Sequence, residues 1–151
     1  MAGRSIITTC LEETQALAQQ FAGLLTAGDV VCFYGDLGAG KTTFIKVLVS
    51  QMTDTPTSAV TSPTFNYCHS YENIHHFDLY RLESSQDFLH LGFDELMNPN
   101  SFCFIEWAER IEDILPTSVW KVHMEVLGTK KRKITYEKYS FSKRDIPSIG
   151  S

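Results

Sequence analysis

The sequence predicts an α/β domain in which a central, mostly parallel sheet is flanked by helices and extended by antiparallel strands. Three segments lead to this fold class. Residues 30–34 form a short, continuous apolar run, which is typical of a strand buried inside a parallel sheet. After a glycine-rich stretch, apolar residues recur at helical spacing from Lys41 to Met52. Later, segments 119–127 and 132–139 flank a polar turn, and this pattern predicts an antiparallel hairpin.

The region before the first strand predicts a helix. Thr9 and Glu12 are spaced as in a capping box, and a helix that begins there would end before Gly28. Its expected apolar face consists of Leu11, Leu17, Ala18, Phe21, Leu24 and Leu25. After the second helix, residues 53–59 combine Pro56 with many hydroxyl side chains, so we expect an irregular connection there.

The middle of the chain predicts a hairpin, a short helix and one more strand. Segments 65–71 and 74–80 have the composition of strands and are separated by a two-residue turn. Ser84 or Ser85 can cap the short helix that follows. Segment 102–105 is wholly apolar and predicts another buried strand.

The stretch between the first strand and the helix after it carries the strongest chemical signal. It fits the pattern G-x-x-x-x-G-K-[ST], in which backbone N–H groups surround nucleotide phosphates. The expected contacts are Gly35, Asp36, Leu37, Gly38, Ala39, Gly40, Lys41, Thr42 and Thr43. Lys41, which we expect to be exposed, would reach the β- and γ-phosphates, and the Thr42 hydroxyl would ligate Mg²⁺. Because strand, loop and helix come in this order, the helix N-terminus would point at the bound anion.

A nucleotide held by such a loop needs a further carboxylate for its metal, usually at the carboxyl end of a neighbouring buried strand. Glu106 follows four apolar residues, and this pattern ranks it first. Asp78 follows the less apolar segment 74–77 and ranks second. Either residue could instead be a surface acid or the partner of Arg81 or Arg110, which lie close in sequence.

Other polar residues have a functional and a structural explanation. Ser62 and Thr64 place hydroxyls around a proline, which suits a segment that senses a γ-phosphate but equally suits an ordinary loop. Trp107 could stack on a ligand or partner, although an aromatic residue of the core or its rim is the simpler explanation. The remaining group matches no zinc pattern and comprises Cys68, His69, His75 and His76.

Length and composition predict one domain over residues 1–140 and a flexible tail over 141–151. A net charge of −5 argues against an autonomous nucleic-acid surface, so any RNA would be met through a partner. The four cysteines form no C-x-x-C motif and suggest reduced, structural thiols. With no long apolar segment, the expectation is a cytoplasmic protein that binds no membrane.

Taken together, five ordered segments resemble the bacterial TsaE (YjeE) family: 34–43, 62–65, 76–82, 91–93 and 105–110. The resemblance covers roughly residues 5–137. It implies a P-loop NTPase fold and an ATPase that uses ATP and Mg²⁺. In that family the ATPase is needed to form N6-threonylcarbamoyladenosine at position 37 of tRNAs that read ANN codons. The implied partners are TsaD and TsaB, with tRNA reached indirectly through their complex.

The resemblance also implies roles for individual residues. Its catalytic residues correspond to Lys41, Asp78 and Glu106, its metal ligands to Thr42 and Glu106, and its switch to Ser62 and Thr64. Its adenine site corresponds to two separate segments and would involve Thr9, Cys10, Leu11, Lys130, Lys131 and Arg132.

Two other functions remain compatible with a phosphate-binding loop. One is a small-molecule P-loop kinase, although such kinases usually clamp phosphates with several arginines from one lid, whereas the arginines here are scattered along the chain. The other is a nucleotide-dependent assembly factor whose hydrolysis is not essential. A variant that binds ATP and partner but does not hydrolyse would distinguish the assembly factor from the ATPase.

Overall fold

The computed structural model describes residues 3–36, 38–63 and 65–140. Leu37, Thr64 and the predicted tail 141–151 lie outside the described residues. The described strands form one seven-stranded sheet with the order β1-β7-β6-β2-β5-β4-β3. Their bounds are β1 (Arg4–Thr8), β2 (Val30–Tyr34), β3 (Cys68–Tyr71), β4 (Ile74–Asp78), β5 (Phe102–Glu106), β6 (Ser118–Val126) and β7 (Arg132–Ser140). The α-helices are α1 (Leu11–Ala22), α2 (Lys41–Met52) and α3 (Ser85–His90), and the 3-10 helices are η1 (Thr57–Ala59), η2 (Phe93–Leu96) and η3 (Ala108–Ile114).

The sheet is mixed, with a parallel centre and antiparallel additions at both ends. The neighbouring strands β6, β2, β5 and β4 run parallel. Strand β3 pairs antiparallel with β4, while β7 pairs antiparallel with both β6 and β1. This arrangement confirms the predicted parallel centre and the terminal hairpin. Strand β1 was not predicted, because it is short and mostly exposed and owes its extended form to pairing with β7.

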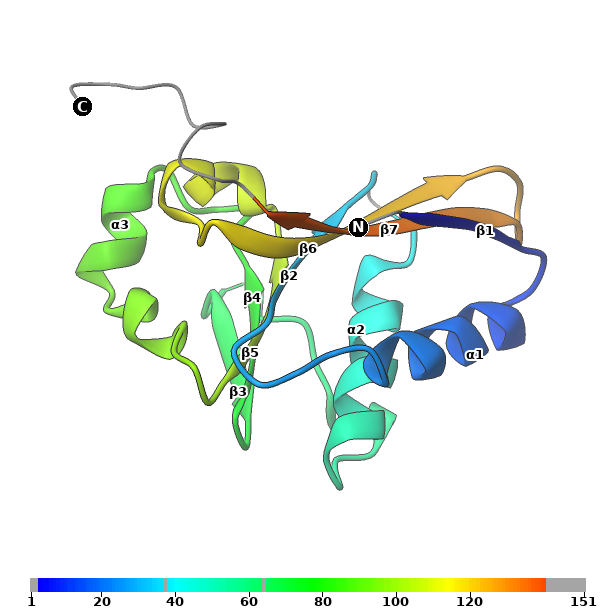
Figure 1. Cartoon of the computed structure of the whole chain (residues 1–151), viewed down its shortest axis with the longest axis horizontal. Helices are drawn as coiled ribbons and strands as arrows, with labels where there is room; N and C mark the ends of the chain where they lie inside the picture. The colour runs from blue at the N-terminus through cyan, green and yellow to red at the C-terminus, as the bar shows by residue number, and fades with distance from the viewer. Residues whose placement is uncertain (1–2, 37, 64, 141–151) are drawn as a thin grey trace.

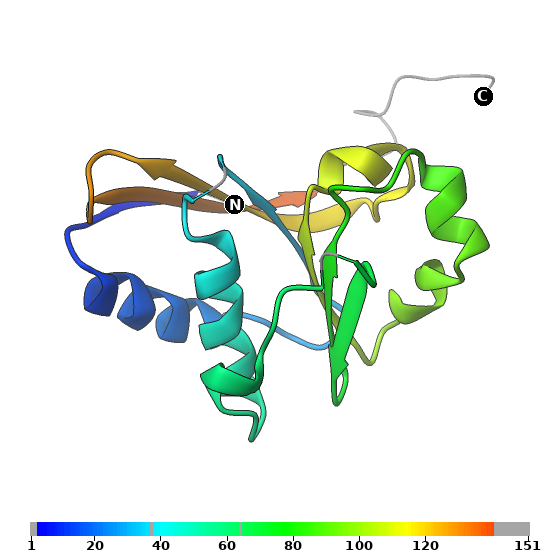
Figure 2. The same ribbon diagram turned by 180° about the vertical axis from the view of Figure 1, so that it is seen from behind.

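Helices cover both faces of the twisted sheet (Figures 1 and 2). Helices α1 and α2 pack on one face, where the ring centroid of Phe21 lies 5.2 Å from Trp120 and 5.1 Å from Tyr136. Helix α3 and the 3-10 helices η2 and η3 cover the other face around Phe77 and Phe88, whose ring centroids are 5.5 Å apart. The alternating side chains of β2 reach both cores, which explains its continuous apolar run.

Helix α1 differs from its prediction. It ends at Ala22, and Leu11 and Leu24 are 52% and 48% exposed rather than part of a buried face. The backbone N–H and hydroxyl of Thr9 both donate to Glu13 Oε1, so Glu13, not Glu12, closes the first turn. Helical periodicity therefore located the helix, but it did not fix where the helix ends.

Other predicted elements are confirmed with shifted limits. Ser84 is the N-cap of α3 and accepts a hydrogen bond from the Asp87 backbone N–H. Strand β3 begins at Cys68 rather than at 65, and β4 ends at Asp78 rather than at 80. All four cysteines are free thiols, and Cys32 and Cys103 are buried. Among the described residues, no helix combines the length and apolar character that a membrane crossing requires.

Candidate functional site

The carboxyl ends of three parallel strands meet at one edge of the sheet. Phe33 of β2 is in register with Glu106 of β5, and Glu106 is in register with Asp78 of β4. Beyond β5 the chain crosses to β6 on the other side of β2, so this edge is a topological switch point. Such points are the usual ligand sites of open α/β sheets.

The glycine loop joins β2 to α2 at this edge, and its glycines are required by the backbone. Gly35 has φ +148°, and a Cβ there would lie 2.5 Å from the Met124 carbonyl oxygen. Gly40 is the N-cap of α2 with φ +103°. Because the first amides of a helix lack intrahelical acceptors, the start of α2 offers N–H donors beside the loop. Gly35 and Gly40 thus have backbone conformations that favour glycine, as the sequence pattern of the loop predicts.

Lys41 is buried rather than exposed, which corrects the sequence-based expectation. Its side chain starts in the first turn of α2, the residue is 6% exposed, and its Nζ lies 4.7 Å from the centroid of the Trp107 ring. Trp107 is half-buried, has φ +62°, and packs against Tyr80 at a centroid distance of 4.9 Å. The aromatic ring therefore holds the ammonium group next to the loop through a cation–π contact.

Glu106 joins two other polar side chains at the first turn of α2 and in β4. It is 4% exposed, and the Thr42 hydroxyl donates to its two carboxylate oxygens, each at 3.2 Å. His76, which has no exposed surface, donates from Nε2 to Glu106 Oε2 at 2.8 Å. No described residue pairs with His76 Nδ1, so the hydrogen bond to Glu106 is the one side-chain hydrogen bond of this imidazole within the described chain.

Asp78 lies beside Glu106 in a different environment. Burial, and then the negative charge of Glu106, raise the pKa of Asp78, while the Tyr80 backbone N–H, Lys41 and His76 oppose this shift. That N–H lies 3.1 Å from Asp78 Oδ1. The two adjacent carboxyl groups therefore differ in their surroundings: side-chain donors hold Glu106, whereas burial makes Asp78 easier to protonate than an ordinary aspartate.

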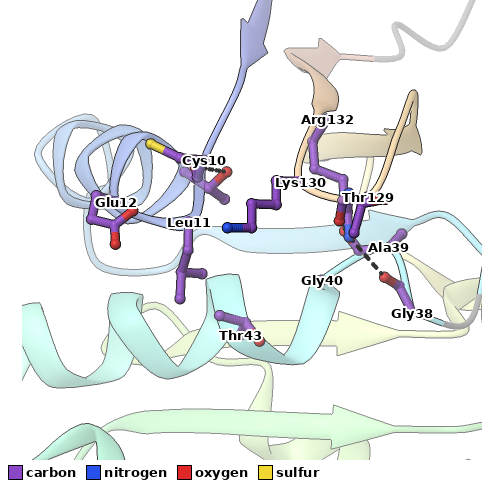
Figure 3. A pocket seen from close by; sticks show the side chains of 11 residues that line it. Cys10, Leu11, Glu12, Gly38, Ala39, Gly40, Thr43, Thr129, Lys130 and Arg132 are labelled. Carbon is purple, nitrogen blue, oxygen red and sulfur yellow. Dashed lines mark hydrogen bonds between the residues drawn. The ribbon is translucent and has the colours of Figure 1, made fainter.

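Two cavities adjoin the glycine loop. The first, of about 240 Å³, is lined by Gly38, Gly40, Lys41, Thr42, Thr43 and Glu106. The second, of about 460 Å³, lies between the start of α1, the loop and the β6–β7 turn (Figure 3). Both cavities include Gly38, Gly40 and Thr43 in their walls, so they are adjacent compartments along one loop.

The second cavity contains part of the predicted adenine site. Cys10, Leu11, Lys130 and Arg132 line it, whereas Thr9 and Lys131 do not. The lining also includes Glu12, Thr14 and Thr129, for which the sequence predicted no role in the site.

The described part of the predicted switch does not line either cavity. Ser62 is exposed and lines neither of them, and Thr64 lies outside the described residues. The neighbouring Thr61 is tied to β3, because its backbone N–H donates to the Tyr71 hydroxyl at 3.2 Å. The switch role therefore stays a prediction.

The residues at the first cavity fit a magnesium–nucleotide complex. Thr42 and Glu106 bring together a hydroxyl and a carboxylate, and both are the hard oxygen donors that Mg²⁺ prefers. The described residues contain no cluster of three or more His, Cys, Asp or Glu side chains that could hold a metal by themselves. A few protein ligands supplemented by phosphates are typical of Mg²⁺ in nucleotide-binding proteins.

Comparison with known proteins identifies the family. Residues 8–134 match the family model described as Threonylcarbamoyl adenosine biosynthesis protein TsaE. The chain belongs to the TsaE family. The protein named tRNA threonylcarbamoyladenosine biosynthesis protein TsaE from Rickettsia felis is 41% identical over 125 residues, covering 80% of this chain and 72% of that relative. The Bacillus subtilis protein of the same name is 37% identical over 129 residues, covering 83% and 79%. The crystal structure of Bacillus subtilis YdiB aligns with a TM-score of 0.71 at 30% identity, covering 93% of this chain and 87% of that one.

His76 is a site residue that the sequence reasoning missed. The spacing of the histidines matches no zinc pattern and by itself indicates no site. A different signal was present: residues i and i+2 of a strand share a face, so His76 lies on the same face of β4 as Asp78. Its partner could not be named from sequence, because the contact with Glu106 spans 30 residues.

Proposed function

We propose that this protein is a Mg²⁺-dependent ATP hydrolase that supports formation of N6-threonylcarbamoyladenosine at position 37 of ANN-decoding tRNAs, together with TsaD and TsaB. Membership of the TsaE family supports the pathway. The nucleotide chemistry rests on one observation above all. The Thr42 hydroxyl, in the first turn after the glycine loop, meets the carboxylate of Glu106 at the end of a neighbouring strand.

Each residue of the site has a role in this proposal. The loop amides and the first turn of α2 would donate hydrogen bonds to phosphate oxygens, and Lys41 would add a positive charge. Thr42 and Glu106 would hold Mg²⁺, which neutralises charge on the phosphates. His76 would keep Glu106 oriented through its 2.8 Å hydrogen bond. Asp78, whose pKa is raised by burial, would orient the attacking water and accept its hydrogen bond.

A pair of variants tests this division of roles. Glu106→Gln should weaken nucleotide binding in the presence of Mg²⁺ more than binding in a chelator, because it removes a metal ligand. Asp78→Asn should bind nucleotide nearly as the wild type does and hydrolyse ATP more slowly. Calorimetric titration with and without Mg²⁺, followed by phosphate release, measures both effects. Equal loss of binding in both variants under both conditions would contradict the proposal.

The partnership needs a separate experiment. If the γ-phosphate orders a switch segment, protein loaded with a non-hydrolysable ATP analogue should bind a purified TsaD–TsaB assembly more tightly than protein loaded with ADP. Equal dissociation constants would remove the switch and leave the ATPase proposal standing. Asp78→Asn also distinguishes the ATPase from the assembly-factor alternative. If hydrolysis is essential, a variant that binds ATP and partners but does not hydrolyse should fail to support tRNA modification; an assembly factor would still support it.

The kinase alternative has less support. Among the described residues, Arg132 is the one arginine that lines either cavity at the loop, and it donates to loop carbonyls. A phosphoryl-transfer lid would need guanidinium groups directed at the phosphates.

A further inference from the structure

Arg132 begins β7 directly after the turn of the terminal hairpin, and its guanidinium connects two backbone segments. Toward the glycine loop, Nε donates to the Ala39 carbonyl oxygen at 3.0 Å and Nη2 donates to that of Gly38 at 3.4 Å. Toward its own turn, Nη1 donates to carbonyl oxygens at 3.0–3.4 Å, and these belong to Gly128, Thr129 and Lys131. One side chain therefore ties the hairpin turn to a loop more than 90 residues away in sequence (Figure 3).

These bonds occupy most of the donors of the guanidinium. The group has five N–H bonds, and Nε, both N–H bonds of Nη1 and one of Nη2 are directed at carbonyl oxygens. Arg132 also lines only the larger cavity and not the smaller one with Lys41 and Glu106. A direct role on the phosphates is therefore disfavoured.

The carbonyls that Arg132 holds control the direction of the loop amides. In a planar trans peptide, the C=O of one residue and the N–H of the next point in opposite directions, and the described chain contains no cis peptide bond. Holding the Ala39 carbonyl thus turns the Gly40 N–H away from Arg132. The same reasoning applies to the Gly38 carbonyl and the Ala39 N–H, which donates to the Asp36 carbonyl at 3.0 Å. Arg132 therefore stabilises the turn at whose end α2 begins.

We propose that Arg132 is a positioning residue for the phosphate loop, which it fixes by its carbonyl contacts, and that it does not recognise the base. This inference rests on the proposed nucleotide-binding function of the loop. Arg132 then supports the loop instead of contacting adenine, the role that the family resemblance implied. The hairpin turn, which also lines the larger cavity, thereby becomes a support for the loop.

Three ligands separate a positioning role from base recognition: ATP, tripolyphosphate without a base, and adenosine without phosphate. The variants are Arg132→Ala, Arg132→Lys, which keeps the charge but loses the planar guanidinium, and Lys133→Ala, the adjacent exposed cation, as a matched control. Calorimetric titration in Mg²⁺ should show both Arg132 variants binding ATP and tripolyphosphate about tenfold or more weakly, the effect of a lost hydrogen bond to a charged group. Adenosine binding by the Arg132 variants should match the wild type, and so should the binding of all three ligands by Lys133→Ala.

Other outcomes would overturn the proposal. If ATP and adenosine binding fall while tripolyphosphate binding is kept, Arg132 contacts the base. If Arg132→Lys binds ATP and tripolyphosphate like the wild type, positive charge alone is sufficient and the guanidinium hydrogen bonds are not needed.

A second measurement requires no nucleotide. Hydrogen exchange of the ligand-free protein should be faster over residues 38–43 in both Arg132 variants than in Lys133→Ala, because the loop loses its hydrogen bonds to Arg132. Unchanged hydrogen exchange in both Arg132 variants would refute the positioning role, whether or not the protein binds nucleotide. Absence of nucleotide binding by the wild type would refute the proposed function alone. Circular dichroism of each variant verifies that the domain is folded, and Arg132→Lys remains as the milder change if Arg132→Ala does not fold.

Discussion

Replacing His76 with leucine should destabilise the protein through Glu106. The carboxylate is 4% exposed, and it would keep the Thr42 hydroxyl at 3.2 Å but lose the Nε2–H donor at 2.8 Å. A hydrogen bond to a charged group contributes about 1.5–3 kcal/mol. For a chain of 151 residues, this loss corresponds to a decrease in Tm of about 3–12 °C. Leucine also removes the buried Nδ1, which offsets part of the loss, so a single variant does not isolate the hydrogen bond.

A double-mutant cycle isolates it. Glu106→Met removes the carboxylate at nearly constant volume. Urea denaturation without nucleotide then gives the free energies of unfolding of the wild type, His76→Leu, Glu106→Met and the double variant. We expect a coupling energy of about 1.5–3 kcal/mol. His76→Gln, which retains an N–H donor, should lose less stability than His76→Leu. If the two single effects add within about 0.5 kcal/mol, the pair is not coupled and the reasoning is wrong.

Three further predictions concern neighbouring residues. Burial raises the pKa of Asp78 in the folded protein above its ordinary value of 3.8, so the folded state holds this proton more tightly than the unfolded state does. The protonated carboxyl therefore contributes to stability at acid pH, and this contribution is lost as the pH rises through the raised pKa. Asp78→Asn should therefore be more stable than the wild type at neutral pH and lose this advantage below pH 3.8, as urea titrations across pH would measure. Lys41→Ala should abolish ATP binding in calorimetry while costing no more than about 2 kcal/mol of stability, the upper range of a cation–π contact; wild-type affinity would refute the phosphate-loop assignment. Gly35→Ala should lower stability by about 1–3 kcal/mol, because the new Cβ meets the Met124 carbonyl, whereas Gly38→Ala, with no atom within 4 Å of its Cβ, should cost less in the same thermal denaturation assay.

Much of the site is encoded in local patterns. A strand, a glycine loop and a helix in that order are adjacent in sequence, so their geometry follows from the conformational preferences of a few residues around Gly35 and Gly40. The four apolar residues before Glu106 correctly predicted a buried strand with a carboxylate at its end. The turn of the terminal hairpin was likewise predictable, because turn chemistry depends on neighbours along the chain.

Long-range contacts determined the rest. The parallel register of β4 with β5 places His76 and Asp78 beside Glu106, and no local pattern specifies that register. The cation–π contact with Trp107 buries Lys41, which sequence alone suggested to be exposed.

The sequence by itself therefore determined most of the helices and strands and the chemical groups available at the glycine loop, because both depend on short stretches of chain. Only the tertiary structure decided which of these groups touch. It joined Glu106 to Thr42 and His76, and it directed Arg132 to loop carbonyls more than 90 residues away. The physical reason is that side-chain hydrogen bonds depend on distances that strand order, strand register and helix packing establish together.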